Sequence, residues 1–507
     1  MFRRLLAAAL VLVATPAHAD WYEASSAHFV VYSEQKPEKL RAFADQLERF
    51  DKAVRVLWGV SDQPVGPANR VTVYVVGDIA DVQKLTTSRN AAGFYEGRAT
   101  GPVAFVPRSA GTDETDLSAM AILLHEYAHH FMFTTWPHAA YPAWYVEGFA
   151  EFLATTRFEK DGSVVVGYPP QYRASGIFQQ SLSTERMLAA DARKLGDMQM
   201  DSLYGRGWLL THYLMIEGKR GNQGMDYLKA INGGKSALDA AKQAFGDLNL
   251  LDRELDRYAR GRFGARRIAA KVVTPGPITL RRLSPGQEAM MDVRIRSQAG
   301  VNEETAPRVY VRAKKAAAPF PNDPAVQRAL AEAAFDAGDF AEAEAAADRA
   351  IAADPKLVEA LCYKARAQMA RAAKAKDLSP ETWKAIRRTI AAANRLDPED
   401  PEPLMLYYRS FADAHAMPPQ LAREGLYKAF NLAPQDDGLR LNAAVVQLRD
   451  KKVADARETL RPLAFNPHGG GLAEYASKIV AAIDSGGEVA ALKVVDADDS
   501  PKDGAVD

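Results

Sequence analysis

Two histidines and a glutamate are spaced so that they could form a metal-dependent hydrolytic centre. The segment His125-Glu126-Tyr127-Ala128-His129 has the form HExxH. On a helix, residues four positions apart project from one face, so both imidazoles can reach one ion at roughly 2.0–2.1 Å. The Glu126 carboxylate beside them can take a proton from a metal-bound water without being a ligand itself. The motif therefore predicts metal-assisted hydrolysis.

A second acidic segment supplies the ligand that the motif lacks. A catalytic zinc site takes three protein ligands and leaves one position for water. Glu147 follows His129 by 18 residues, in the segment WYVEGFAEF, on a helix expected to begin near Pro142. Glu151 lies one turn further and could accept the free ring N–H of a ligating histidine. We therefore expect His125, His129 and Glu147 to bind Zn²⁺, with Glu151 behind one imidazole.

These motifs resemble those of the gluzincins, the peptidase MA clan that includes thermolysin and aminopeptidase N. In the aminopeptidase N branch the third ligand lies in a sequence such as WLNEGFA, where this chain reads WYVEGFA. The resemblance covers roughly residues 70–263 and implies a zinc peptidase with Glu126 as its base. That branch also has a tyrosine, in a pattern like YEKGxxxL, which donates to the substrate oxyanion. By resemblance, Tyr204 in YGRGWLL is the candidate for that role.

Two features depart from that branch. The interval between the second histidine and the third ligand is one residue shorter, which the loop 134–142 could absorb. The Gly-Ala-Met-Glu-Asn segment that holds a free amino terminus is not found. Its nearest analogue, residues 92–97, is expected to form an edge strand that pairs with an extended peptide. We therefore expect an endopeptidase. Separately, Gly148, which follows Glu147, is expected to leave the backbone room close to the metal.

Composition and the first residues bound the partners and the compartment. Sixty-four Lys and Arg balance 64 Asp and Glu in 507 residues, which leaves no net field to hold a nucleic acid or an anionic membrane. Because Cys362 is the single cysteine, no intramolecular disulfide can form. Residues 1–19 have the form of a signal peptide whose apolar run is too short for a permanent span. We expect a periplasmic protein without stable membrane insertion, and secretion is the second choice.

The chain is expected to have an α+β fold followed by an all-α extension. Residues 20–112 alternate strand-like runs with one helical segment, which predicts a small mixed sheet with a helix packed on it. Residues 113–270 carry HExxH and are mainly helical, with the segment 112–116 expected to cap the helix of the motif. Together these parts form the predicted gluzincin-like domain, 20–270. Residues 271–317 are rich in Pro, Gly and β-formers, so we expect a linker or a small β subdomain.

From residue 318 onward the chain is Ala-rich and repetitive. Polar turns along it are closed by prolines, at Pro324, Pro355, Pro398, Pro434 and Pro467. Their spacings of 31, 43, 36 and 33 residues are typical of helical-hairpin arrays. The unit 331–355, with Gly338 at its turn, resembles a tetratricopeptide repeat. We expect three to four such repeats over 318–485 that bind a protein partner, with a non-repeating bundle as the alternative, and a disordered tail over 486–507.

Three functions are compatible with these features. The first is an exported zinc-dependent peptidase acting on a peptide or protein substrate, with a repeat region for protein binding. The second is a catalytically silent binding or assembly protein that keeps the peptidase scaffold. The third is a purely structural repeat protein, which predicts sub-stoichiometric metal. The intact Glu126 favours the first function over the second, because a scaffold needs no base.

Overall fold

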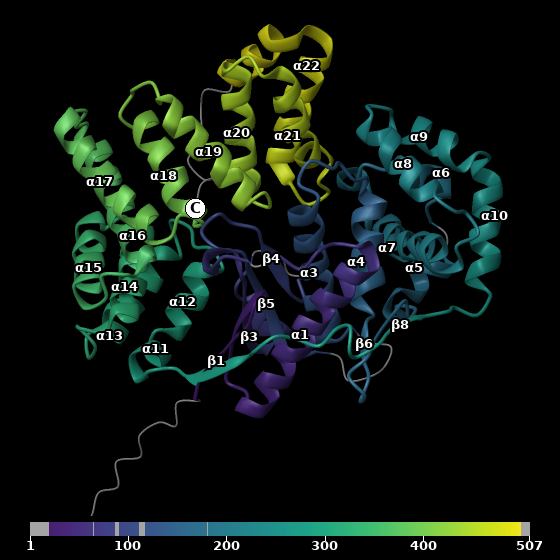
Figure 1. Ribbon diagram of the computed structural model, residues 1–507, viewed down its shortest axis with the longest axis horizontal. Coiled ribbons are helices and arrows are strands. Elements are labelled where there is room, and N and C mark those ends of the chain that lie inside the picture. The colour runs from purple at the N-terminus through teal and green to yellow at the C-terminus, as the bar shows by residue number, and fades with distance from the viewer. Residues whose placement is uncertain (1–19, 64, 87–90, 111–116, 180, 498–507) are drawn as a thin grey trace, which may run out of the picture.

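The computed structural model describes residues 20–63, 65–86, 91–110, 117–179 and 181–497 (Figure 1). Figure 1 shows a sheet at the centre, helices α5–α10 on one side of it, helices α12–α19 on the other, and helices α20–α22 above it. The expected signal peptide, residues 1–19, lies outside the described residues. No helix in the described part of the chain combines the length and apolar character needed to cross a membrane.

The central sheet is mixed, as predicted, and has the strand order β4-β5-β3-β2-β1-β9. Strand β2 pairs in parallel with β3, and β3 with β5, while the other pairs are antiparallel. The strands are β1 (Tyr22–Ser25), β2 (Phe29–Ser33), β3 (Val71–Asp78), β4 (Phe94–Glu96), β5 (Val103–Ser109) and β9 (Thr279–Arg282). Strand β4 therefore lies at one edge of the sheet.

The two faces of the sheet are covered by different helices, because alternate strand residues point to opposite faces. On one face Val31 and Val73 pack in the main core with α1 (Pro37–Trp58). On the other face Tyr32 and Tyr74 stack at 5.4 Å between ring centroids, beside Met291 of α12. Both faces of this sheet are thus buried.

The segment 271–317 is neither a linker nor a separate β subdomain, so both expectations for it were wrong. Strand β9 joins the central sheet beside β1. Three helices follow, α11 (Pro285–Ala289), α12 (Met291–Gln298) and α13 (Ala306–Ala317). Met291 and Ile295, four residues apart on α12, both pack on the sheet. The Pro and Gly content before residue 287 obscured this helical spacing.

The helical part of the first domain contains α3 (Ala119–Thr135), α4 (Ala143–Ala154) and α7 (Asp197–His212). Residues 111–116, part of the expected cap, lie outside the described residues, and Ser118 accepts the Ala121 N–H at the start of α3. A second sheet joins β6 (Arg157–Phe158), β7 (Val164–Val166) and β8 (Arg266–Ile268). The remaining helices are α2 (Ile79–Gln83), α5 (Ala174–Phe178), α6 (Thr184–Leu188), α8 (Gln223–Asn232), α9 (Ala237–Phe245) and α10 (Leu248–Ala259). Shorter turns are η1 (Pro67–Asn69), η2 (Gln171–Arg173), η3 (Ala192–Lys194) and the π-helical η4 (Tyr213–Glu217).

The C-terminal region is an array of helical hairpins, which confirms the repeat prediction in outline. Separate small cores of mostly Ala and Leu side chains follow one another along it, as expected when each repeat packs on its neighbours alone. Gly338 takes φ +77° at the first turn, a conformation that favours glycine. The helices are α14 (Pro324–Asp336), α15 (Phe340–Ala353), α16 (Val358–Ala375), α17 (Pro380–Leu396), α18 (Pro401–Ala412), α19 (Gln420–Leu432), α20 (Asp437–Arg449), α21 (Val453–Phe465) and α22 (Gly470–Ala497).

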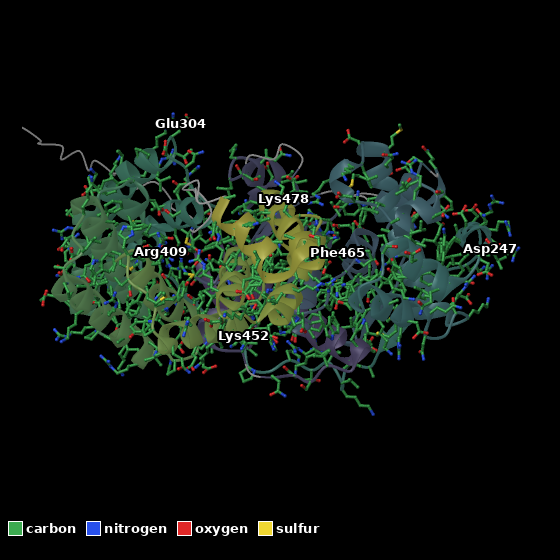
Figure 2. All side chains as sticks on the ribbon, turned by 90° about the horizontal axis from the view of Figure 1, so that it is seen from above. Asp247, Glu304, Arg409, Lys452, Phe465 and Lys478 are labelled. Carbon is green, nitrogen blue, oxygen red and sulfur yellow. The ribbon has the colours of Figure 1, made fainter. Side chains whose placement is uncertain are left out.

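The prediction of disorder from residue 486 was wrong for residues 486–497. Helix α22 continues to Ala497 across a kink at Gly487. Ala491 and Val495, four residues apart, pack on the last core of the array, so the acidic composition hid an apolar face. Residues 498–507 lie outside the described residues. Seen from above, the C-terminal helices that carry Phe465 and Lys478 lie over the middle of the molecule (Figure 2).

Candidate metal centre

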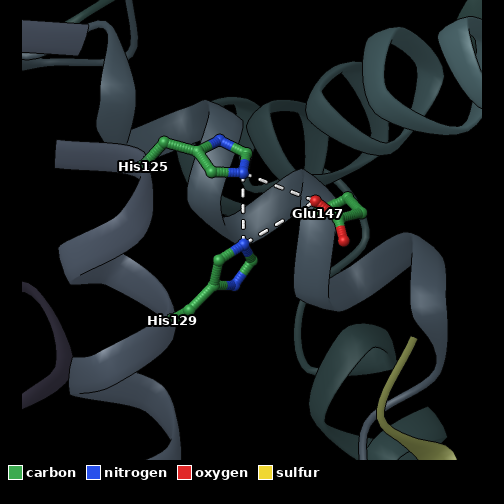
Figure 3. Close-up of side chains that lie close together, drawn as sticks. All are labelled: His125, His129 and Glu147. Carbon is green, nitrogen blue, oxygen red and sulfur yellow. Dashed lines mark hydrogen bonds and ion pairs between the residues drawn. The ribbon is translucent and has the colours of Figure 1, made fainter. Parts of the chain in front are cut away.

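Helices α3 and α4 bring the three predicted metal ligands together (Figure 3). The Nε2 atoms of His125 and His129 are 3.1 Å apart. Glu147 Oε2 is 3.5 Å from His125 Nε2 and 3.7 Å from His129 Nε2. One ligand atom from each residue therefore faces a common point, which is the arrangement that a three-ligand cation site requires.

The polar atoms of His125, His129 and Glu147 are better arranged to bind a cation than to hydrogen-bond with one another. Glu147 is 0% exposed, and its Oε2 atom accepts no hydrogen bond of normal geometry from the described residues. Burial of an ionised carboxylate without full pairing costs several kcal/mol. A divalent cation held by the two imidazoles and this carboxylate would offset that cost. The donor set, two imidazoles and one carboxylate, suits zinc.

The protonation of the two imidazoles differs because their neighbours differ. Burial and the adjacent His125 ring hold the pKa of His129 well below its ordinary value, despite the charge of Glu147. A neutral imidazole is the form that binds a metal. Burial also acts on His125, but contacts with Glu147 and Glu151 outweigh it and raise the pKa. Glu147 itself has a pKa well below its usual range, because three nearby imidazoles outweigh its burial.

Glu126 lies beside the two histidines on the wall of a cavity of about 830 Å³. Burial raises the pKa of its carboxyl above the ordinary value. A general base works best when its pKa approaches the working pH. The position and the environment of Glu126 therefore both suit proton transfer at this centre.

Glu151 lies behind His125, on the opposite side of the ring from Glu147. Its Oε1 is 3.6 Å from His125 Nδ1, and the side chain is 1% exposed. Tyr172 donates to Glu151 Oε2 at 2.9 Å, and Arg173 Nε donates to Oε1 at 3.0 Å. Carboxylates placed in this way orient metal-binding imidazoles. The roles of Tyr172 and Arg173 were missed, because nothing in their local sequence marks them as neighbours of α4.

Tyr204 reaches the same cavity from α7. Its ring stacks on His125 at 6.0 Å between centroids, and the Arg173 guanidinium lies 4.4 Å from the centre of the Tyr204 ring. Burial, followed by the charge of Glu147, raises the pKa of Tyr204 well above its ordinary value. The hydroxyl therefore keeps its proton and is able to donate it in a hydrogen bond.

Gly148 has a different role from the one expected. A Cβ atom at Gly148 would lie 2.4 Å from the carbonyl oxygen of Gly207 on α7. A Cβ at Gly207 would in turn lie 2.8 Å from the carbonyl oxygen of Trp144. The two glycines allow α4 and α7 to cross in backbone contact, and this crossing sets Tyr204 beside Glu147.

His468 also contacts the centre, although no motif around it suggested a role there. It lies in the turn between α21 and α22, and its Nε2 is 2.7 Å from Glu147 Oε1. Its ring is 5.3 Å from that of His129. The imidazole is 51% exposed; its partial desolvation lowers the pKa, but the charge of Glu147 outweighs this and raises the pKa to about 9.

The cavity in front of these residues has two walls from distant parts of the chain. One wall is the edge of the central sheet, with Tyr95 and Glu96 of β4. The other is the C-terminal array, with Asp437 and Leu463. The edge strand expected over 92–97 is thus present at the site, and its pairing with a peptide stays a prediction.

A second group of potential ligands, His28, Asp51 and Asp62, is already paired with cationic side chains. Arg55 Nε lies 2.7 Å from Asp51 Oδ2, and Lys52 Nζ lies 3.4 Å from Asp62 Oδ2. These cations neutralise the two carboxylates, so the group is better described as a buried ion-pair network than as a metal site.

Comparison with known proteins does not identify a family. No family model matches the sequence, and no curated protein matches it. A thermophilic TPR protein of Thermus thermophilus, TTC0263, is 16% identical in sequence; the match covers 37% of this chain and 93% of the TTC0263 chain, with a TM-score of 0.31. Yeast Tom70 is 14% identical and covers 64% of this chain and 72% of its own, with a TM-score of 0.25. TM-scores this low do not establish a shared fold, so the repeat assignment rests on the helix pairs of the structure itself. The gluzincin resemblance stays a prediction from short motifs.

Proposed function

We propose that this chain is a protein-binding repeat protein with a zinc-dependent peptidase centre. The observation that carries the proposal is the convergence of His125, His129 and Glu147, with interatomic distances of 3.1–3.7 Å. Glu126 lies beside them on the cavity wall. Hydrolysis of peptide bonds is the reaction class that this set of groups serves best.

The residues of the centre divide the work of hydrolysis among them. Zn²⁺ bound to His125, His129 and Glu147 would polarise the scissile carbonyl and acidify a water molecule. Glu126 takes the proton of the attacking water and passes it to the leaving amide nitrogen. Tyr204, which keeps its proton, donates a hydrogen bond to the oxyanion that develops on the substrate.

The edge strand and the array could together bind an extended polypeptide substrate. We place this substrate in the periplasm, the compartment expected from residues 1–19. Strand β4 is the edge strand among the described residues, and such an edge can offer backbone N–H and C=O groups to an extended chain. The cavity lies between this edge and the C-terminal helices. Helical-hairpin arrays present extended surfaces that bind proteins. The array would therefore hold a partner or a substrate beside the centre.

A second candidate is a binding or assembly protein without turnover. It is favoured by the array of helical hairpins, an architecture that commonly binds proteins. It leaves the position of Glu126 beside the ligands without a purpose. In this case the metal centre would serve only to stabilise the first domain.

Glu126→Gln separates the two candidates. The substitution removes the base and leaves the three ligands, so the peptidase proposal expects full zinc content and loss of cleavage of a proteome-derived peptide library. Cleavage by the wild type but not by the variant supports the proposal. If both are equally inert with zinc bound, the binding candidate stands.

A further inference from the structure

The C-terminal helices are fixed against the first domain by several hydrogen bonds, two of which involve residues of the cavity wall, Asp436 and Arg440. The Asp436 carboxylate accepts the N–H of Ala99 at 2.8 Å. Arg440 Nη1 donates to the carbonyl of Pro137 at 2.7 Å. Arg461 Nη1 donates to the carbonyl of Asn232 at 2.5 Å. Hydrogen bonds from charged groups are among the stronger ones, so the second wall of the cavity has a defined position.

The turn that carries His468 is itself held in place. The Asn466 side chain accepts the N–H of His468 at 3.0 Å, and its amide donates to Asp437 at 3.2 Å. These two hydrogen bonds order the turn that contains His468, just before α22 begins. The imidazole extends from this turn into the cavity.

The contact between His468 and Glu147 uses the carboxylate oxygen that the other histidines leave free. Oε2 faces His125 and His129, while Oε1 faces His468 at 2.7 Å. The ligand atoms of His125, His129 and Glu147 lie within 4.8 Å of one another. A donor on the second oxygen of a ligating carboxylate fixes its rotation without occupying a position at the metal.

We infer that His468 is a positioning residue for the metal-binding carboxylate of Glu147, so that zinc affinity depends on the docked C-terminal helices. The inference rests on the metal-binding part of the proposed function. It makes the array a component of the centre, since the ion pair at Glu147 Oε1 comes from His468 in the turn between α21 and α22. Loss of His468 leaves Glu147 free to rotate away from the two imidazoles.

The test is zinc affinity of the full chain, measured by competition with a chromophoric chelator. His468→Ala is expected to weaken zinc binding by about 10- to 100-fold, the usual effect of removing such a partner. His468→Gln keeps an N–H donor and is expected to restore most of the affinity. The matched control is His138→Ala, because His138 also faces the array, with its ring 6.1 Å from Phe430, but lies away from the ligands. It should bind zinc as the wild type does.

Thermal unfolding of each variant accompanies the affinity measurement, so that a misfolded chain is recognised. Wild-type affinity in a folded His468→Ala chain overturns the inference and leaves the metal centre intact. Failure of His468→Gln to bind better than His468→Ala also overturns it, because a direct ligand would behave in that way. A wild-type chain that binds no zinc overturns the metal centre and this inference together.

Discussion

The crossing of α4 and α7 makes Gly148→Ala a sharp test of how Glu147 is positioned. The added Cβ would lie 2.4 Å from the Gly207 carbonyl oxygen and 2.8 Å from Thr211 Oγ1. Ordinary contact begins at 3.4 Å, so the helices must separate by about 1 Å (3.4 − 2.4). Backbone atoms on α7 have little freedom to move aside.

The expected cost follows from two opposing effects. Overpacking of this kind costs about 1–3 kcal/mol, and alanine gains about 1 kcal/mol over glycine in a helix interior. Because the clash is with backbone, we expect the upper part of the range, which leaves a net loss of about 1–2 kcal/mol. The same displacement moves Glu147 away from the two imidazoles, so zinc affinity should fall as well.

Chemical denaturation followed by tryptophan fluorescence measures the first effect, and chelator competition measures the second. Gly425→Ala in α19 is the matched control, because the nearest atom to its added Cβ is 3.8 Å away. This control is expected to gain up to about 1 kcal/mol. If Gly148→Ala proves as stable as Gly425→Ala and binds zinc normally, the tight crossing does not set the position of Glu147.

Three further outcomes are expected. Tyr204→Phe should lower kcat for peptide cleavage by about 10²- to 10³-fold at unchanged zinc content, and a normal kcat would exclude the hydroxyl from the reaction. Glu151→Ala should weaken zinc binding by about 10- to 100-fold in the chelator assay. Wild-type zinc affinity in a folded Glu151→Ala chain would show that Glu151 does not orient His125. Burial raises the pKa of Asp400 to about 7, so the fold loses stability as the pH rises from about 4, where the unfolded chain gives up this proton, to about 7. Asp400→Asn should therefore raise the free energy of unfolding at pH 8, by at most about 4 kcal/mol, and leave it nearly unchanged at pH 4. Equal effects of Asp400→Asn at both pH values would contradict this reasoning.

Local patterns were sufficient to predict that His125, His129 and Glu147 lie together, and to predict the main elements. The spacing in HExxH places His125 and His129 on one helix face, and the following apolar helix presents Glu147 to them. β-Branched and aromatic runs likewise predicted β2 and β3 of the mixed sheet, whereas β1 and β9 were not foreseen. These signals are short in range, and the structure keeps them because each element packs in the way its own pattern favours.

Longer-range features had no comparable signal in one sequence. Strand β9 pairs with β1 across most of the first domain, and His468 meets Glu147 only because the array folds back over the sheet. Gly148 was expected to leave the backbone room close to the metal, whereas the structure places the backbone of Gly207 on α7 against it. In each case the missing information was which distant element lies opposite, which periodicity does not encode.

Metal analysis of the purified full chain, after zinc loading and desalting, shows whether His125, His129 and Glu147 hold one zinc ion. One zinc per chain is expected in the wild type and in Glu126→Gln, and almost none in Glu147→Ala or His129→Ala. Sub-stoichiometric zinc in the wild type, or full zinc in a folded Glu147→Ala chain, would contradict this assignment of the ligands.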